Sequence, residues 1–177
     1  NLCPSPLPVV EAVVRHTKDM DGDPSFPNRV KMSEGKEATR KLLAEFLRVT
    51  PEEIVITRNT SEGNNLVSSG IDLKSGDEVV LFSDNHPSNL EAWKIKAKRL
   101  GYSVKIIDQV NPHPGGEYYL EAVKRQMTDR TKVLAFTHLT STVGDLLPAR
   151  ELCRLARERG VLTLVDGAQS LGLIDVD

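Results

Sequence analysis

Short apolar segments rich in β-branched residues alternate with helical periodicity from residue 54 onward. Five of them fit strands, because each is four or five residues long and is bounded by polar or turn-forming residues. They are Ile54–Thr57, Val79–Phe82, Val104–Ile107, Val133–Phe136 and Val161–Val165. Strands that alternate with helices in this way are typical of βαβ units. We therefore predict an α/β fold with three layers, in which a mostly parallel sheet carries helices on both faces.

The intervening segments place apolar residues at helical spacing, so each predicts a helix that covers the sheet. The predicted buried positions are Leu90, Trp93, Ala97 and Leu100, then Leu120, Val123 and Met127, then Leu152, Leu155 and Ala156. Pro148 suits the first turn of the last helix, and Gly160 suits the left-handed position after it. Thr50 and Glu53 have the spacing of a capping box, which predicts a short helical turn before the first strand.

Two further helices are predicted ahead of the strands, at Pro8–Lys18 and Lys36–Arg48. Between them, the residues from Asp21 to Pro24 and from Phe26 to Asn28 carry turn signals without periodicity. We therefore divide the chain into an N-terminal helical lead-in, residues 1–50, and a larger α/β part, residues 51–177.

Composition narrows the possible functions. With 177 residues, 39% hydrophobic and 27% charged, the chain fits one globular domain, and its net charge of −2 gives no field that would attract nucleic acid. No apolar segment is long enough for a membrane span. The two cysteines, Cys3 and Cys153, lack the spacing of a metal site or a disulfide framework, so we expect reduced thiols, no metal and a cytoplasmic location.

Polar residues follow four of the five predicted strands. The segments are Arg58–Gly63, Asp84–Asn89, Thr137–Thr142 and Asp166–Gln169. Since the carboxyl ends of parallel strands meet at one edge of a sheet, and ligands of such sheets bind there, we expect these segments to form one site. A helix that begins near Asn59, Thr60 or Ser61 would also present free N–H groups, which suits a phosphate.

Each of these residues also has an ordinary structural interpretation. Thr60 and Ser61 are common helix caps, His86 in a polar loop is consistent with a partly exposed histidine, and Gln169 is consistent with a turn amide. Asp166 is harder to explain structurally, because a carboxylate directly after a buried strand must be paired or hydrogen-bonded. A cap or turn aspartate remains the alternative at that position.

Taken together, the four segments resemble the class V aminotransferase family of fold-type I pyridoxal phosphate (PLP) enzymes. That family includes cysteine desulfurases, selenocysteine lyases and isopenicillin N epimerase-like proteins. The resemblance covers essentially the whole chain and rests on Thr57–Gly63, Asn85–Asn89, Thr137–Gly144 and Val165–Gln169, in the order and at about the spacing of the family. It implies a PLP-dependent enzyme, in its full-length form, that acts on a small amino acid or derivative.

The resemblance also implies roles for single residues. Asp166 matches the aspartate that pairs with the pyridine nitrogen and so lets the ring accept electrons. Gln169 matches the residue that hydrogen-bonds the phenolic oxygen, and Thr60 and Ser61 match the residues that hold the phosphate. His86 matches the histidine that stacks on the ring and can relay protons. The implied catalytic residues are thus His86 and Asp166.

The chain departs from the desulfurase pattern at two positions. Ser141 stands where desulfurases place an asparagine near the phenolic oxygen, which makes Ser141 a further candidate cofactor contact. Asn85 stands where they place an acidic residue. Pro87 and the pair Ser141–Thr142 lie closer to the epimerase-like branch. Because fold does not choose among racemisation, C–S cleavage and amino transfer, the reaction stays open.

The lysine that forms a Schiff base with PLP follows on a later strand in the family, and no residue of this chain matches it. Lys94, Lys96 and Lys98 lie in a predicted helix and cannot take that role. We therefore expect a fragment of a longer enzyme that is inactive by itself. The strands that flank Ile54–Thr57 in the family would be missing too, which leaves that strand with an unpaired edge.

Two other classes of protein remain as alternatives. A Rossmann-like nucleotide-binding domain is less favoured, because no GxGxxG or GxxxxGK[ST] motif follows a predicted strand. The second alternative is a noncatalytic module that keeps the PLP pocket. Resemblance further implies a homodimer.

Overall fold

The computed structural model describes residues 4–176, which divide into two compact units. The first comprises the described residues up to Ile56 and the second comprises Thr57–Val176. Among the described residues, no helix is long and apolar enough to cross a membrane.

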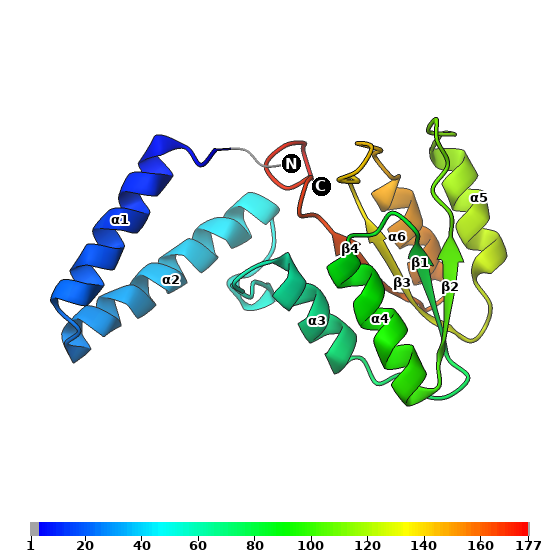
Figure 1. Cartoon of the computed structure of the whole chain (residues 1–177), viewed down its shortest axis with the longest axis horizontal. Helices are drawn as coiled ribbons and strands as arrows, with labels where there is room; N and C mark the ends of the chain where they lie inside the picture. The colour runs from blue at the N-terminus through cyan, green and yellow to red at the C-terminus, as the bar shows by residue number, and fades with distance from the viewer. Residues whose placement is uncertain (1–3, 177) are drawn as a thin grey trace. The chain divides into compact units, whose positions relative to one another are not determined.

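A four-stranded parallel sheet forms the centre of the second unit (Figure 1). Its strands are β1 (Glu78–Phe82), β2 (Ser103–Ile107), β3 (Thr131–Thr137) and β4 (Leu162–Asp166), in the spatial order β2-β1-β3-β4. The helices are α3 (Thr60–Gly70), α4 (Pro87–Leu100), α5 (Gly116–Gln126) and α6 (Ala149–Glu158). This arrangement confirms the predicted fold class.

Alternate residues of the fully buried strand β1 enter two separate cores, one on each face of the sheet. Val79 and Leu81 pack in the core that contains Trp93 of α4. Val80 and Phe82 pack in the other core with residues of α5 and α6, where the ring of Phe82 meets Tyr119 edge-on. The sheet therefore separates α3 and α4 from α5 and α6, which gives three layers (Figure 1).

Glycines in the left-handed conformation follow α4 and α6, where the chain turns toward the next strand. Gly101 ends α4 in the left-handed conformation (φ +80°), and a Cβ there would lie 3.3 Å from the Cβ of Ser75. Only glycine meets both demands without strain. Gly160 follows α6 with φ +66°, as predicted, whereas Pro148 is the N-cap of α6 and lies one position before the helix.

Two further details of the sequence prediction are wrong. Ile54–Thr57 forms no strand: Ile54 has an extended backbone (φ −103°, ψ 124°), but the segment pairs with no strand of the described chain, and Val55 is 77% exposed. A strand needs a hydrogen-bonding neighbour, which apolar composition alone does not supply. Leu100 is 51% exposed because it lies at the end of α4, beyond the core.

The first unit consists of α1 (Leu7–Gly22), α2 (Phe26–Leu47) and a single 3-10 turn, η1 (Pro51–Glu53). The predicted capping box is present: Thr50 N donates to Glu53 Oε2 at 2.8 Å. Both helices are longer than predicted, and Phe26–Asn28 is the first turn of α2 rather than a loop. Pro27 starts a helix readily because the first turn needs no N–H donor.

Buried Asn28 joins the two helices of the first unit. Its Nδ2 donates to the carbonyl oxygens of Asp19 and Asp23, at 3.1 and 2.8 Å. The turn between α1 and α2 is therefore fixed by a side-chain amide that satisfies backbone carbonyls at the end of α1.

Candidate functional site

The chain leaves β1 and β3 toward opposite sides of the sheet, so the carboxyl ends of these two strands form a topological switch point. From β1 the chain crosses through α4 to β2 on one side, and from β3 it crosses through α6 to β4 on the other. Such a point is where open α/β sheets bind ligands. Buried Asn85 joins the two strand ends there, because its Nδ2 donates to Ala135 O at 2.9 Å and its Oδ1 accepts from Thr137 N at 3.0 Å.

Asp166 ends β4 opposite Thr137 and is only 3% exposed. Its Oδ2 accepts a hydrogen bond from Asn64 Nδ2 at 2.9 Å, and its Oδ1 accepts one from Ala168 N at 3.1 Å. No Lys, Arg or His side chain among residues 4–176 forms an ion pair with it. A buried carboxylate held only by neutral donors has unused lone pairs, so it suits a cationic partner from outside the chain.

Asn59 caps α3 and leaves the two residues after it at the helix start. Its Oδ1 accepts from Glu62 N at 2.9 Å, so neither Thr60 nor Ser61 serves as the cap. Thr60 is exposed and Ser61 is half-buried, at the positive end of the helix dipole. The side chain and backbone N–H of Arg58 donate to Glu62 and lower the pKa of its carboxyl group below the ordinary value.

His86 is the exposed N-cap of α4, with Pro87 at the first helical position. Its Nδ1 accepts from Ser88 N at 3.2 Å and lies 2.9 Å from Ser88 Oγ. Because a backbone N–H can only donate, Nδ1 must carry a lone pair, which places the proton of the neutral imidazole on Nε2.

Ser141 and Gln169 belong to the two loops that follow β3 and β4. Both are half-buried. The first loop is closed by an isolated antiparallel bridge between Leu139 and Leu146, and the second turns directly after Asp166. The structure therefore places both residues at the same sheet edge as Asp166.

His138, a residue that the sequence argument left without a role, holds the turn after β4. Its backbone N donates to Asp166 O at 3.0 Å, and its Nδ1 lies 3.1 Å from the hydroxyl of buried Ser170. Ser170 N in turn donates to Gly167 O at 3.1 Å. Burial lowers the pKa of His138 below the ordinary histidine value, which favours a neutral ring in this contact.

Two of the six candidate residues, Asp166 and His86, are linked by hydrogen bonds through intervening side chains. Asn64 contacts Asp166 directly, and its Nδ2 also lies 3.4 Å from Ser88 Oγ, which contacts His86. The other four candidates lie at the same edge, and their roles stay predictions.

Sequence reasoning missed Asn64, although a signal for it exists. Thr60, Asn64 and Ser68 recur at intervals of four residues, which puts them on one face of α3. Asn64 and Ser68 are both buried. A polar stripe where an apolar one is expected indicates partners elsewhere in the fold.

Glu78 lies at the opposite, amino-terminal end of the sheet, and its role is structural. Its carboxylate contacts Lys105 Nζ at 2.7 Å, Arg130 Nη2 at 2.8 Å and Thr128 Oγ1 at 2.6 Å. The hydrogen bond from Lys105, together with those from Thr128 and Arg130, lowers the pKa of Glu78 to about 2. The charged group thus joins β1, β2 and the start of β3.

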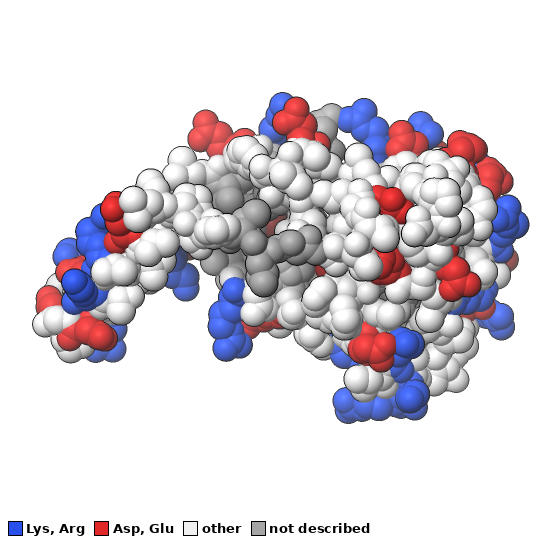
Figure 2. Space-filling model, turned by 45° about the horizontal axis from the view of Figure 1, so that its top comes forward, with Lys and Arg blue, Asp and Glu red and all other residues white. Residues whose placement is uncertain are grey.

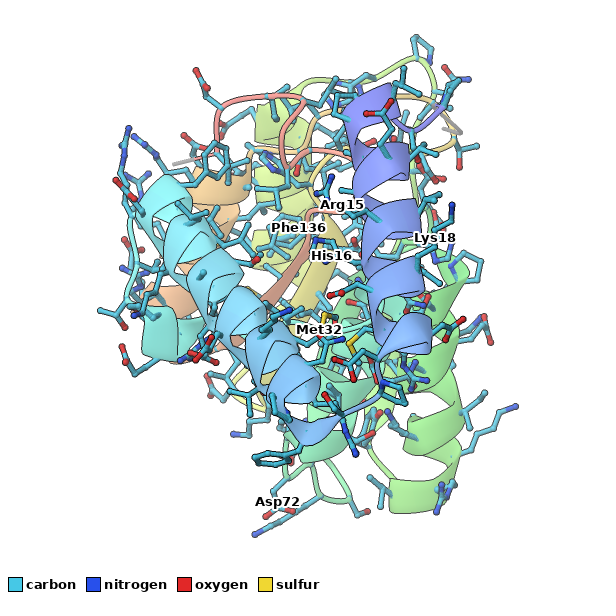
Figure 3. All side chains as sticks on the ribbon, turned by 90° about the vertical axis from the view of Figure 1, so that its left-hand side faces the viewer. Arg15, His16, Lys18, Met32, Asp72 and Phe136 are labelled. Atoms are coloured by element: carbon cyan, nitrogen blue, oxygen red, sulfur yellow. The ribbon has the colours of Figure 1, made fainter. Side chains whose placement is uncertain are left out.

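A groove of about 940 Å³ lies in the first unit, between α1 and α2. His16 and Met32 point into the space between these helices, whereas Lys18 points away (Figure 3). None of the six candidate residues lines this groove. Acidic and basic side chains are interspersed on the face shown in Figure 2.

The fold and the sheet edge define a three-layer α/β domain with a candidate ligand site at its switch point. A sequence model of the family described as Aminotransferase class-V matches residues 3–177. The chain therefore belongs to the class V aminotransferase family.

Curated relatives agree with the family. The chain is 30% identical over 177 residues to a probable cysteine desulfurase of Methanothermobacter thermautotrophicus, covering 98% of this chain and 43% of that protein. It is 33% identical over 177 residues to an isopenicillin N epimerase of Amycolatopsis lactamdurans, covering 98% of this chain and 44% of that protein. The chain thus spans less than half the length of these relatives.

Solved structures show the same fold. The complex of the cystine C-S lyase C-DES with its reaction product, cysteine persulfide, matches 97% of this chain and 46% of its own, with a TM-score of 0.89 and 26% identity. An apo cysteine desulfurase of Thermococcus onnurineus NA1 matches 96% of this chain and 43% of its own, with a TM-score of 0.79 and 28% identity.

Proposed function

We propose that this chain supplies part of the PLP site of an enzyme that acts on a small amino acid or derivative. The observation that carries the proposal is Asp166, a buried carboxylate with neutral donors on both oxygens and no cationic partner among the described residues. A pyridinium N–H supplies the missing positive charge and a hydrogen-bond donor. The relatives include desulfurases, an epimerase and a C-S lyase, so the reaction belongs to that group.

The residues of the site fit PLP by their chemistry. Bound PLP supplies an electron sink for a carbanion that forms at the α-carbon of the substrate. Asp166 would hold the proton on the ring nitrogen, and Thr60 and Ser61 would donate to the phosphate at the start of α3. His86, Ser141 and Gln169 would orient the ring, His86 from its face and the other two near its phenolic oxygen.

The wider assignments follow from the same family membership. We propose that residues 51–177 are part of a PLP-binding large domain, that residues 1–50 lead into it, and that the full-length enzyme is a homodimer in the cytoplasm. The free, half-buried thiol of Cys153 supports a reducing compartment.

The decisive test is Asp166→Asn in the full-length protein. The amide keeps the size of the side chain but loses the charge that retains the ring proton. We expect turnover to fall about 100-fold or more and the Kd for PLP to rise about tenfold. Visible absorption and PLP content report cofactor binding, and assays of sulfide release and of epimerisation on a panel of amino acids report the reaction.

Asp175→Asn is the matched control, since Asp175 is an exposed carboxylate on the same C-terminal segment. Near-normal turnover and cofactor content in Asp166→Asn would overturn the assignment of PLP to this site. PLP binding by the wild type without turnover on any substrate would favour a noncatalytic PLP-binding module instead.

A further inference from the structure

A continuous hydrogen-bonded path links the two candidate catalytic residues. It runs from Asp166 Oδ2 to Asn64 Nδ2 (2.9 Å), from Asn64 Nδ2 to Ser88 Oγ (3.4 Å), and from Ser88 Oγ to His86 Nδ1 (2.9 Å). The path joins three elements, because Asn64 lies on α3, Ser88 on α4 and Asp166 at the end of β4. Its two inner members are uncharged.

The direction of every bond in this path follows from one fixed point. Asn64 presents its amide nitrogen to Asp166, so Asn64 Nδ2 donates and Asp166 Oδ2 accepts. The same nitrogen carries a second proton, which points to Ser88 Oγ. The Ser88 hydroxyl then accepts from Asn64 and donates its own proton to His86 Nδ1, beside the donation from Ser88 N.

We propose that Asn64 and Ser88 are positioning residues that form an uncharged bridge between Asp166 and His86 and set the orientation of both. This inference rests on the proposed function, since it concerns the same site. Asn64 fixes the plane of the Asp166 carboxylate without neutralising it, and Ser88 fixes the imidazole of His86 with Nδ1 as acceptor. A cationic residue in place of Asn64 would hold the carboxylate but cancel the charge that the site requires.

Burial explains why the bridge is specific to these positions. Asn64 is 3% exposed, so loss of its amide leaves the buried Asp166 carboxylate with one donor, Ala168 N. The next residue, Asn65, is exposed, and its Nδ2 donates to Ser61 O within the same helix. Asn65 is therefore a neighbouring control of the same residue type that takes no part in the bridge.

A double-mutant cycle without PLP tests the bridge. Asn64→Ala and Ser88→Ala are made singly and together, and the unfolding equilibrium constant of the full-length protein is measured in urea. We expect Asn64→Ala to raise this constant about tenfold. The losses of unfolding free energy in the two single variants should be non-additive, because either change disrupts the shared path. The control cycle pairs Asn65→Ala with Ser88→Ala and should be additive. Ser88→Thr keeps the hydroxyl and should restore wild-type behaviour.

The ring of His86 gives a readout that a merely structural role would not move. The 177-residue chain has four histidines, and in histidine-selective ¹⁵N labelling the variant His86→Gln identifies the His86 signal. The Nδ1 resonance should shift in Ser88→Ala and also in Asn64→Ala, because Asn64 is linked to His86 through Ser88. It should not move in Asn65→Ala.

Titration with PLP separates this inference from the proposed function. We expect Asn64→Ala to raise the Kd for PLP about tenfold and Asn65→Ala to leave it unchanged. A wild type that does not bind PLP would overturn the proposed function, while the unfolding cycle and the His86 resonance would still decide on the bridge. Additive losses of unfolding free energy in the Asn64/Ser88 cycle, together with an unmoved His86 resonance in Asn64→Ala, would overturn the bridge. If Asn64→Ala does not fold, an unmoved His86 resonance in Ser88→Ala would overturn it instead.

Discussion

Asp166 shows how one residue can hold a charge ready for a ligand. Neutral N–H donors from Asn64 and Ala168 make its burial tolerable, whereas an arginine or lysine would have satisfied the carboxylate completely. The lone pairs that these donors leave unused are then available to a cation that enters the site. At the residue scale, an amide rather than a cationic side chain at position 64 therefore indicates a cationic ligand as clearly as the Asp166 carboxylate does.

His86 has a structural role and a proposed catalytic role, and two substitutions separate them. His86→Asn keeps a good helix cap but removes the flat imidazole, whereas His86→Ala removes both. We expect His86→Ala to lose about 1 kcal/mol of unfolding free energy and His86→Asn to lose little. Both should slow turnover about 100-fold if the imidazole moves a proton.

The two measurements for His86 are urea unfolding without PLP, and turnover with the visible spectrum of bound PLP. Normal turnover and spectrum in His86→Asn would leave the histidine with only its cap on α4. The unfolding data show whether any loss in His86→Ala comes from a disturbed helix start instead.

At the scale of elements, sequence patterns predicted what depends on local periodicity and missed what depends on partners. Strands β1 to β4 were recognisable from short apolar segments, and Asp166 was recognisable because a carboxylate follows one of them. Ile54–Thr57 has the same apolar character but forms no ladder, because pairing is a property of two segments. Asn64 was missed for the same reason: its partner Asp166 is 102 residues away in sequence.

The start of α2 gives a second example of this limit. Phe26–Asn28 contains a proline and an asparagine, which normally indicate a turn. In the structure Pro27 lies in the first helical turn, and Asn28 points its amide back to the end of α1. Only the neighbouring helix distinguishes these two interpretations.

The cluster around Glu78 predicts how the sheet responds to acid. Its pKa is lowered from 4.5 to about 2 in the folded protein, so the folded state binds this proton less readily than the unfolded state. The stabilisation is complete above about pH 4.5 and is lost as the pH falls toward 2. We expect Glu78→Gln to lower the unfolding free energy by about 2 kcal/mol near neutral pH and to remove this pH dependence.

Urea unfolding at a series of pH values checks the Glu78 prediction. Asp129→Asn is the control, because Asp129 is an exposed carboxylate between Thr128 and Arg130, the two residues that contact Glu78 before β3. If Glu78→Gln retained the wild-type loss of stability between pH 4.5 and 2, another carboxylate would have to be responsible.

The two units of the molecule differ in how much of their chain they bury. The second unit has two apolar cores, whereas α1 has no buried residue and α2 buries only Asn28 and Ala44. Valines of α1 remain 43–60% exposed, among them Val10 and Val13. Stability should therefore be concentrated in the sheet, since local unfolding is easiest where few apolar contacts are made.

Hydrogen exchange on the 177-residue chain tests this difference. We expect backbone amides of α1 to exchange about 100-fold faster than those of β1 and β3, because opening α1 exposes almost no additional apolar surface. Mass spectrometry of peptides from Leu7–Gly22 and Thr131–Thr137 gives both rates in one experiment, and the concentration of the chain is varied. Protection of α1 equal to that of β3 at all concentrations would contradict the expectation. Protection that appears only at high concentration would mean that a second copy of the chain covers the exposed valines, since only an intermolecular contact depends on concentration.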